Sequence, residues 1–108
     1  MIAKTPKPPY YAVIFTSIRT NNTNNYLETA KRMEELAKLQ EGYLGIESAR
    51  EELGITVSYW DSLGAILNWK NNIEHTIARE KGTEIWYESY HVRICKVVRE
   101  YGFKKESD

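Results

Sequence analysis

The sequence is poor in the residue types that build metal and phosphate sites. Its 108 residues include one cysteine, two histidines and six glycines. A single cysteine, Cys95, cannot form an internal disulfide, and no Cys-x-x-Cys or histidine-rich spacing occurs, which excludes a tetrahedral structural zinc site. No Walker pattern or other glycine-rich phosphate loop is present. We therefore expect no metal site.

Charge of one sign and long apolar runs are also missing. The 15 basic and 15 acidic residues give no net charge at pH 7, which argues against a general attraction to nucleic acid or anionic membranes. No apolar run approaches the roughly 20 residues that span a bilayer. The first residues lack the apolar stretch of a signal peptide. With so little cysteine, we expect a cytoplasmic protein without nucleic-acid or membrane partners.

All three prolines lie within the first nine residues, and they exclude this segment from a central sheet. We expect residues 1–9 to form an extended lead-in, residues 10–103 a single domain and residues 104–108 a polar tail. A domain of this length can bury a core but has little spare stability.

The apolar pattern predicts four strands and two helices. β-Branched and aromatic residues favour strands at 10–19, 43–50, 55–60 and 85–103, and helical spacing favours helices at 26–40 and from 63 to a stop at Gly82. Asn25 with Glu28 fits a capping box, and Ser62 fits a cap for the second helix. Asn71-Asn72 either bends the second helix or leaves it intact.

The predicted order of elements is that of the ferredoxin-like α+β fold, βαββαβ, with an antiparallel sheet and both helices on one face. On the last strand, Trp86 and Tyr90 alternate with Tyr87 and His91, so both faces carry large apolar groups. A solvated second face should be polar. We therefore expect that face to pack against the sheet of a second copy, giving a homodimer.

The stretches "ITVSYW", "AILNWK", "EH", "WYESYHVRI" and "YGF" resemble the antibiotic biosynthesis monooxygenase (ABM) family, in particular its small bacterial members. The resemblance covers roughly residues 10–103. It implies a homodimer whose sheets form a dimeric α+β barrel, with a pocket between the helices and the sheet of each subunit. Family members either oxidise polycyclic aromatic substrates with molecular oxygen and no cofactor, or bind and degrade haem.

The match to the cofactor-free oxygenases is partial. Trp60 matches their tryptophan at the end of the third strand. Those enzymes also have an asparagine four residues before it and a tyrosine six residues after it, where this chain has Thr56 and Ile66. Ile66 has no polar group and Thr56 is shorter, so neither can do the same work.

The match to the haem-degrading members is partial as well. Trp69 matches their tryptophan in the second helix. Their histidine ten residues later is replaced by Arg79, and His75 comes only six residues after Trp69. The first strand, "YYAVIFTSIR", lacks their asparagine. The chain thus keeps the aromatic residues of both groups without their key polar residues.

His75 is the first candidate catalytic residue, because a neutral imidazole accepts a proton from an acidic aromatic alcohol or binds iron. On an unbroken helix it shares a polar, solvated stripe with Asn68, Asn72 and Arg79. A break at Asn71-Asn72 would turn it inward. Which of these holds decides whether the enzyme has this base.

Glu47 is the second candidate catalytic residue. Strand alternation gives it one face with Tyr43, Gly45 and Ala49. Buried there, its carboxylate acts as a base with a raised pKa; alternatively it pairs with Arg93 or caps the barrel edge.

The candidate substrate-binding residues are aromatic. Trp60, Trp69 and Trp86 either stack on a flat ring or simply form the core, and Tyr59 and Tyr90 supply phenolic hydrogen bonds. The predicted function is a cofactor-independent monooxygenase that acts on a small aromatic molecule, which itself gives the electron to oxygen. The alternatives are a haem-binding or haem-degrading protein and a non-enzymatic dimer that binds a small molecule.

Overall fold

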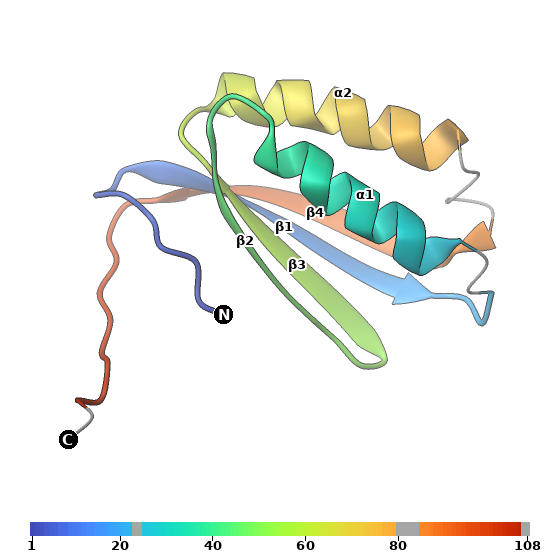
Figure 1. The fold of residues 1–108 in the computed structure, drawn as a ribbon, viewed down its shortest axis with the longest axis horizontal. Helices are drawn as coiled ribbons and strands as arrows, with labels where there is room; N and C mark the ends of the chain where they lie inside the picture. The colour runs from blue at the N-terminus through green and yellow to red at the C-terminus, as the bar shows by residue number, and fades with distance from the viewer. Residues whose placement is uncertain (23–24, 80–84, 107–108) are drawn as a thin grey trace.

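A four-stranded antiparallel sheet carries two helices on one face. The computed structural model describes residues 1–22, 25–79 and 85–106, without the side chains of positions 75, 78 and 79. The elements are β1 (Tyr10–Arg19), α1 (Tyr26–Lys38), β2 (Tyr43–Arg50), β3 (Leu53–Trp60), α2 (Leu63–Arg79) and β4 (Tyr87–Val97). The strand order is β2-β3-β1-β4, and both helices lie above the sheet (Figure 1). The predicted ferredoxin-like α+β fold is confirmed.

The two helices start in different ways. Ser62 Oγ accepts a hydrogen bond from the backbone N–H of Ala65 at 3.1 Å, so the predicted cap of α2 is confirmed. The predicted capping box at Asn25 is wrong. Asn25 has φ 57° and ψ 7° and makes no side-chain cap, because capping requires the extended backbone that this left-handed conformation replaces. Asn tolerates this conformation better than most residues.

Helix α2 runs without a break from Leu63 to Arg79. The amide of Asn72 donates to the carbonyl of Asn68 at 3.0 Å and to Gln40 Oε1 at 3.3 Å. These bonds satisfy the side chain locally and leave the helix intact, so the asparagine pair does not bend it. The predicted stop at Gly82 lies outside the described residues.

Two one-residue bulges change which side chains share a face. Tyr43 pairs with Trp60, whereas Gly45 pairs with Tyr59. One extra residue therefore lies between Tyr43 and Gly45, and the two no longer share a face. Tyr43 therefore faces the helices, and the prediction that it shares a face with Glu47 is wrong.

The second bulge lies at the start of β4, where Tyr87 pairs with Arg19 and Ser89 pairs with Ile18. It brings Tyr87 to the helix side together with Tyr90. Trp86 precedes the strand instead of alternating within it. The predicted pairing of Tyr87 with His91 on one face is therefore wrong, because one inserted residue shifts the alternation. The last strand also ends at Val97 rather than at residue 103.

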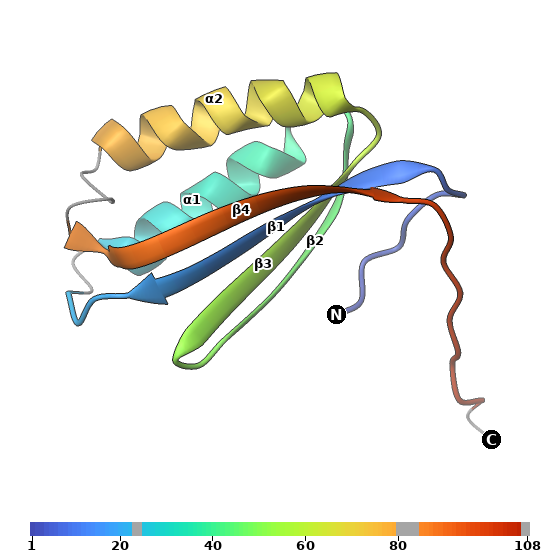
Figure 2. The same cartoon turned by 180° about the vertical axis from the view of Figure 1, so that it is seen from behind.

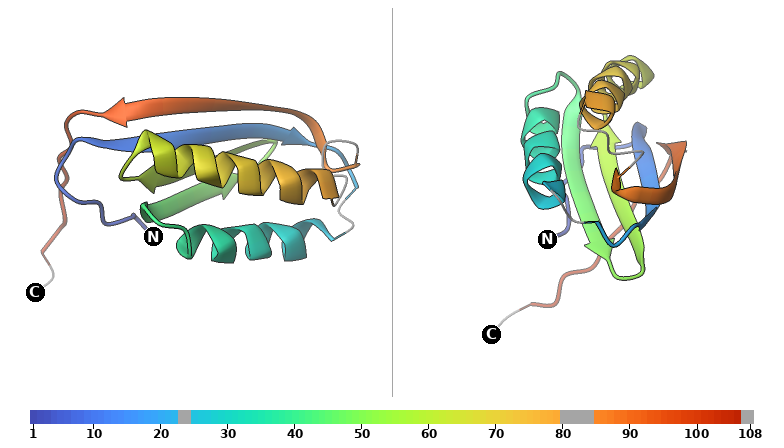
Figure 3. Two further views of the ribbon diagram at one scale, coloured as in Figure 1. Left: turned by 90° about the horizontal axis from the view of Figure 1, so that it is seen from above. Right: turned by 90° about the vertical axis from the view of Figure 1, so that its right-hand side faces the viewer.

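The core lies between the helices and the sheet. Trp60 is fully buried, and its ring stacks on that of Trp69 with centroids 5.9 Å apart and an interplanar angle of 26°. Met33 and Ala37 of α1 and Ile66 of α2 belong to the same cluster. Seen from behind and from above, the helices run side by side over one face of the sheet, and within the described ranges the other face has no helix (Figures 2 and 3).

The segment after Val97 leaves the sheet and extends away from the body (Figures 1 and 2). Among the described residues, no helix is both long and apolar enough to cross a membrane.

Candidate functional site

A cavity of about 580 Å³ lies between the two helices and the sheet. Its walls are mainly apolar and come from every element of the fold. The helices supply Tyr26, Leu27, Ala30, Met33, Glu34, Ile66, Trp69, Lys70, Ile73, Glu74 and Ile77, and the strands supply Val13, Phe15, Ile46, Ser48, Ala49, Arg50, Ile55, Thr56, Ser58, Tyr87, Tyr90, Val92 and Ile94. A volume of this size suits a small organic ligand.

Strand register explains how the floor of the cavity is built. The rows Ile46–Ser58–Val13–Ile94 and Ser48–Thr56–Phe15–Val92 cross β2, β3, β1 and β4 on the helix side. The half of the floor from β2 and β3 is therefore rich in hydroxyl groups. The half from β1 and β4 is apolar. A ligand in the cavity meets one polar edge and one apolar face.

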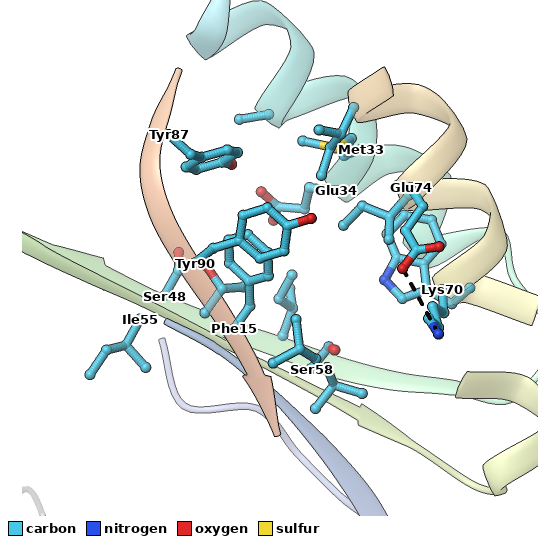
Figure 4. A pocket seen from close by; sticks show the side chains of 18 of the residues that line it. Phe15, Met33, Glu34, Ser48, Ile55, Ser58, Lys70, Glu74, Tyr87 and Tyr90 are labelled. Carbon is cyan, nitrogen blue, oxygen red and sulfur yellow. Dashed lines mark ion pairs between the residues drawn. The ribbon is translucent and has the colours of Figure 1, made fainter. Parts of the chain in front are cut away.

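Three aromatic rings form one wall of the cavity. Phe15 and Tyr90 stack with centroids 5.2 Å apart and an interplanar angle of 21°, and Tyr87 meets both rings edge-on. Figure 4 shows these rings together, with the ion pair of Lys70 and Glu74 across the cavity. Tyr90 is 40% exposed whereas Tyr87 is buried, so part of the aromatic wall is open to solvent.

The polar groups that line the cavity differ in their hydrogen-bond partners, their protonation and their ion pairing. Ser58 Oγ accepts the indole N–H of Trp60 at 2.9 Å. Burial raises the pKa of Tyr87, and the neighbouring Tyr26 raises it further, so Tyr87 stays a neutral phenol at physiological pH. The pair of Lys70 and Glu74 is held at 3.9 Å and both side chains are well exposed.

Among the predicted site residues, the structure brings Trp69 and Tyr90 to the cavity. Trp60 lies behind Trp69 in the core. Trp86 is 1% exposed and meets Tyr26 edge-on at 5.6 Å. Neither Trp60 nor Trp86 is among the described lining residues, so their large rings support the walls from behind.

Glu47 and Tyr59 lie on the opposite face of the sheet. Tyr59 Oη donates to Glu47 Oε1 at 2.5 Å, and the backbone N–H of Ala3 donates to Glu47 Oε2 at 2.9 Å. These bonds lower the pKa of Glu47 below its ordinary value, whereas the base predicted at this position needs a raised one. Burial and the bond to Glu47 raise the pKa of Tyr59 to about 12.

A second network on the same face joins both terminal segments. Tyr10 Oη and Thr5 Oγ1 donate to Glu100 at 2.5 and 2.7 Å, and the ring of Tyr10 meets that of Tyr59 edge-on. Glu47 therefore belongs to a group of bonds that fastens the ends of the chain to the sheet, and it does not reach the cavity.

His75 belongs to α2, but its side chain lies outside the described residues. The helix break that would have turned it inward does not occur. Glu74 and Ile77, on either side of it in α2, line the cavity.

Several lining residues were not predicted as site residues. Phe15 lies two residues from Val13 on the same face of β1, and Tyr26 lies at helical spacing from Met33, so a face assignment of these two elements would have found them. Arg50 offered no such signal, because its place in the site depends on contacts with two other strands.

Comparisons with known proteins agree with this architecture. No protein-family model matches the chain. The uncharacterised protein YqjZ of Bacillus subtilis is 53% identical over 109 residues, covering 99% of this chain and 96% of YqjZ. SnoaB, a cofactor-independent oxygenase from Streptomyces nogalater, matches 87% of this chain and 97% of its own at 8% identity, with a TM-score of 0.68.

A candidate antibiotic biosynthesis monooxygenase from Nitrosomonas europaea matches 92% of this chain and 99% of its own, with 12% identity and a TM-score of 0.67. At such low identities the structural matches establish the fold, whereas the identity to YqjZ establishes close kinship. The chain belongs to the family of YqjZ, and its fold is that of the antibiotic biosynthesis monooxygenase-like proteins.

Proposed function

We propose that the protein binds a small, flat, electron-rich aromatic molecule in the helix–sheet cavity and oxidises it with molecular oxygen, without a bound cofactor. The observation that carries the proposal is the aromatic wall of Phe15, Tyr87 and Tyr90 beside a cavity of about 580 Å³. Flat rings bind well against such a wall because offset stacking adds to apolar burial. The activity of SnoaB, on a similar fold, supports the same reaction class.

The proposed reaction suits a phenolic ring that carries an activated CH2 group. Loss of a proton gives an electron-rich anion, which passes an electron to O2. The resulting radical pair recombines to a peroxide on that carbon. Loss of water then leaves a carbonyl group, so CH2 and O2 become C=O and H2O. The protein need supply only an apolar site and a proton acceptor.

Glu74 and His75 of α2 are the two candidates for the proton acceptor. Helix α2 is unbroken, so helical spacing puts position 75 about half a circle from Ile66, whereas Glu74 lines the cavity. Glu74→Gln is therefore expected to lower the rate at least 100-fold, the usual range for losing a general base, and His75→Ala is the matched control on the same helix turn. A rate that is unchanged in Glu74→Gln but lost in His75→Ala would transfer the role to the imidazole.

Oxidation of anthrone tests the proposal, with oxygen uptake and the absorbance of anthraquinone as readouts. Ala30→Phe is expected to abolish oxidation, because Ala30 lines the cavity and the added ring occupies it. Lys31→Phe, the neighbouring exposed position on α1, is expected to behave as wild type. Binding of anthrone without oxygen uptake would favour the non-enzymatic binder. An equal loss of oxidation rate in both variants would refute the cavity as the site of the reaction.

Haem binding remains an alternative that rests on the family resemblance and His75. No described residue that lines the cavity is a histidine. Titration with haemin tests it, and a Soret shift that disappears in His75→Ala would favour this alternative over the oxygenase.

The proposal includes a homodimer formed through the face of the sheet that no helix covers. Ile18 and Leu53 expose 42% and 48% of their surface there, and such a surface favours a second sheet. Light scattering at micromolar concentration should give twice the mass of one chain. Val57→Arg, on β3 of the same face, is expected to give monomers, and a monomeric wild type would refute the dimer.

A further inference from the structure

The side chain of Arg50 is held in a fixed position at one end of the cavity. The row Arg50–Gly54–Ser17–Tyr90 crosses the four strands on the helix side. Gly54 is buried, and a Cβ atom added to it would collide with the guanidinium group of Arg50. The absence of a side chain at position 54 is what lets Arg50 lie across β3 and reach β1.

Ser17 holds the guanidinium group in that position. Nη2 of Arg50 donates to Ser17 Oγ, and Nη1 donates to the Ser17 carbonyl oxygen at 3.4 Å. Ser17 is 1% exposed, so this anchor is fixed by the sheet. A guanidinium group has five N–H donors, and those not directed at Ser17 are left for another acceptor.

Among the described residues that line the cavity, Arg50 is the cation without an ion pair. Lys70 is paired with Glu74 at 3.9 Å, and Glu34 is paired with Lys38 at 3.6 Å. No carboxylate of the described residues forms an ion pair with Arg50. Ser48 and Thr56, in the next row of the sheet, extend the polar edge from Arg50 into the cavity.

We propose that Arg50 is the anion-binding residue of the cavity, and that the ligand is a flat aromatic molecule with a carboxylate group. The inference rests on the proposed binding of an aromatic molecule and names its chemical class. The ring system lies along Phe15 and Tyr90, and the carboxylate meets the guanidinium group. The planar fork of arginine fits a carboxylate through two parallel hydrogen bonds.

The position of Arg50 also predicts a preference for charged ligands over uncharged ligands of the same shape. Tyr90 and Ser17 are directly paired across β4 and β1, so the guanidinium group lies in the row of Tyr90 and one row from Phe15, which stacks on Tyr90. A molecule that stacks on these rings brings a substituent on its edge to Arg50. An uncharged ligand of the same shape gains the stacking but not the charge-assisted bonds.

Two matched probes test the proposal: anthracene carboxylate and the uncharged anthracene carboxamide, titrated by fluorescence. Wild-type protein is expected to bind the carboxylate about tenfold or more tightly than the carboxamide, since hydrogen bonds to charged groups are stronger by that order. Arg50→Gln should remove the preference while keeping the affinity for the carboxamide. Arg93→Gln, the same charge change on the opposite face of the sheet, should leave the preference unchanged.

Arg50→Lys is the second variant, in case Arg50→Gln fails to fold. It keeps the charge but loses the fork, and it should keep a reduced preference for the carboxylate. Equal binding of both probes by the wild type, or a preference that survives in Arg50→Gln, would overturn the role of Arg50 and leave the aromatic cavity standing. Failure of the wild type to bind either probe would overturn both proposals.

Discussion

Both faces of the sheet carry aromatic residues, but the two sets have different surroundings. On the helix side, Phe15, Tyr87 and Tyr90 contact one another through their rings and line an open volume. On the other side, Tyr59 and Glu47 are joined by a 2.5 Å hydrogen bond, as are Tyr10 and Glu100. Side chains with satisfied partners stabilise the fold, whereas side chains around unfilled space are available to a ligand.

The two faces also differ in which parts of the chain cover them. The helix side has two helices that cannot fill the space over β4, so Val92 and Ile94 remain 44% and 52% exposed beside the cavity. The other side has no helix in the part of the chain that the structure describes, and the terminal segments form hydrogen bonds to it through Ala3 and Glu100. A cavity therefore forms on one side, and hydrogen-bonded terminal segments cover part of the other.

The largest effect is expected from the core under the cavity. Trp60→Ala should destabilise the fold by about 3–5 kcal/mol, because it empties a fully buried site and removes the support of Trp69. Urea denaturation followed by circular dichroism measures this loss. Lys31→Ala, at an exposed position on α1, should change stability by less than about 0.5 kcal/mol. Similar losses in the two variants would contradict the role of Trp60 as the support of the cavity.

A smaller effect is expected at Ser58, which also lines the cavity. Ser58→Ala leaves the buried indole N–H of Trp60 without its acceptor, at a cost of about 1–3 kcal/mol. Ser89→Ala, exposed on β4, is the matched control. A loss of stability in Ser58→Ala no larger than that in Ser89→Ala would mean that a water molecule replaces the hydroxyl group and accepts the indole N–H.

Glu47→Gln should have the smallest effect, about 1 kcal/mol at neutral pH, and it should depend on pH. The hydrogen bonds from Tyr59 and Ala3 hold the pKa of Glu47 below its ordinary value of 4.5. The unfolded chain therefore binds more protons in acid, so the stabilisation is complete above the unfolded pKa and is lost as pH falls through the folded pKa.

The advantage of wild type over Glu47→Gln should accordingly be constant near neutrality and shrink below about pH 4.5. Thermal melts of both proteins across this range measure it. A rate of anthrone oxidation that falls in Glu47→Gln with stability unchanged would instead give Glu47 a catalytic role.

Local patterns predicted the order of elements and the cap at Ser62, since both depend on spacing within a few residues. They also indicated Trp69 and Tyr90 as lining residues. The faces of Tyr43 and Tyr87 were not predictable, because a single inserted residue in a strand reverses every assignment beyond it. Arg50 could not be found from the sequence, since its position requires Gly54 and Ser17 on two other strands.

The central claim is that the ligand site lies on the helix side of the sheet, and isoleucine methyl resonances test it most directly. Ile46, Ile66, Ile73, Ile77 and Ile94 line the cavity, whereas Ile14 and Ile18 lie on the opposite face. Titration with anthracene carboxamide should shift the first group and leave the second unchanged. Shifts confined to Ile14 and Ile18, or none at all, would contradict the account.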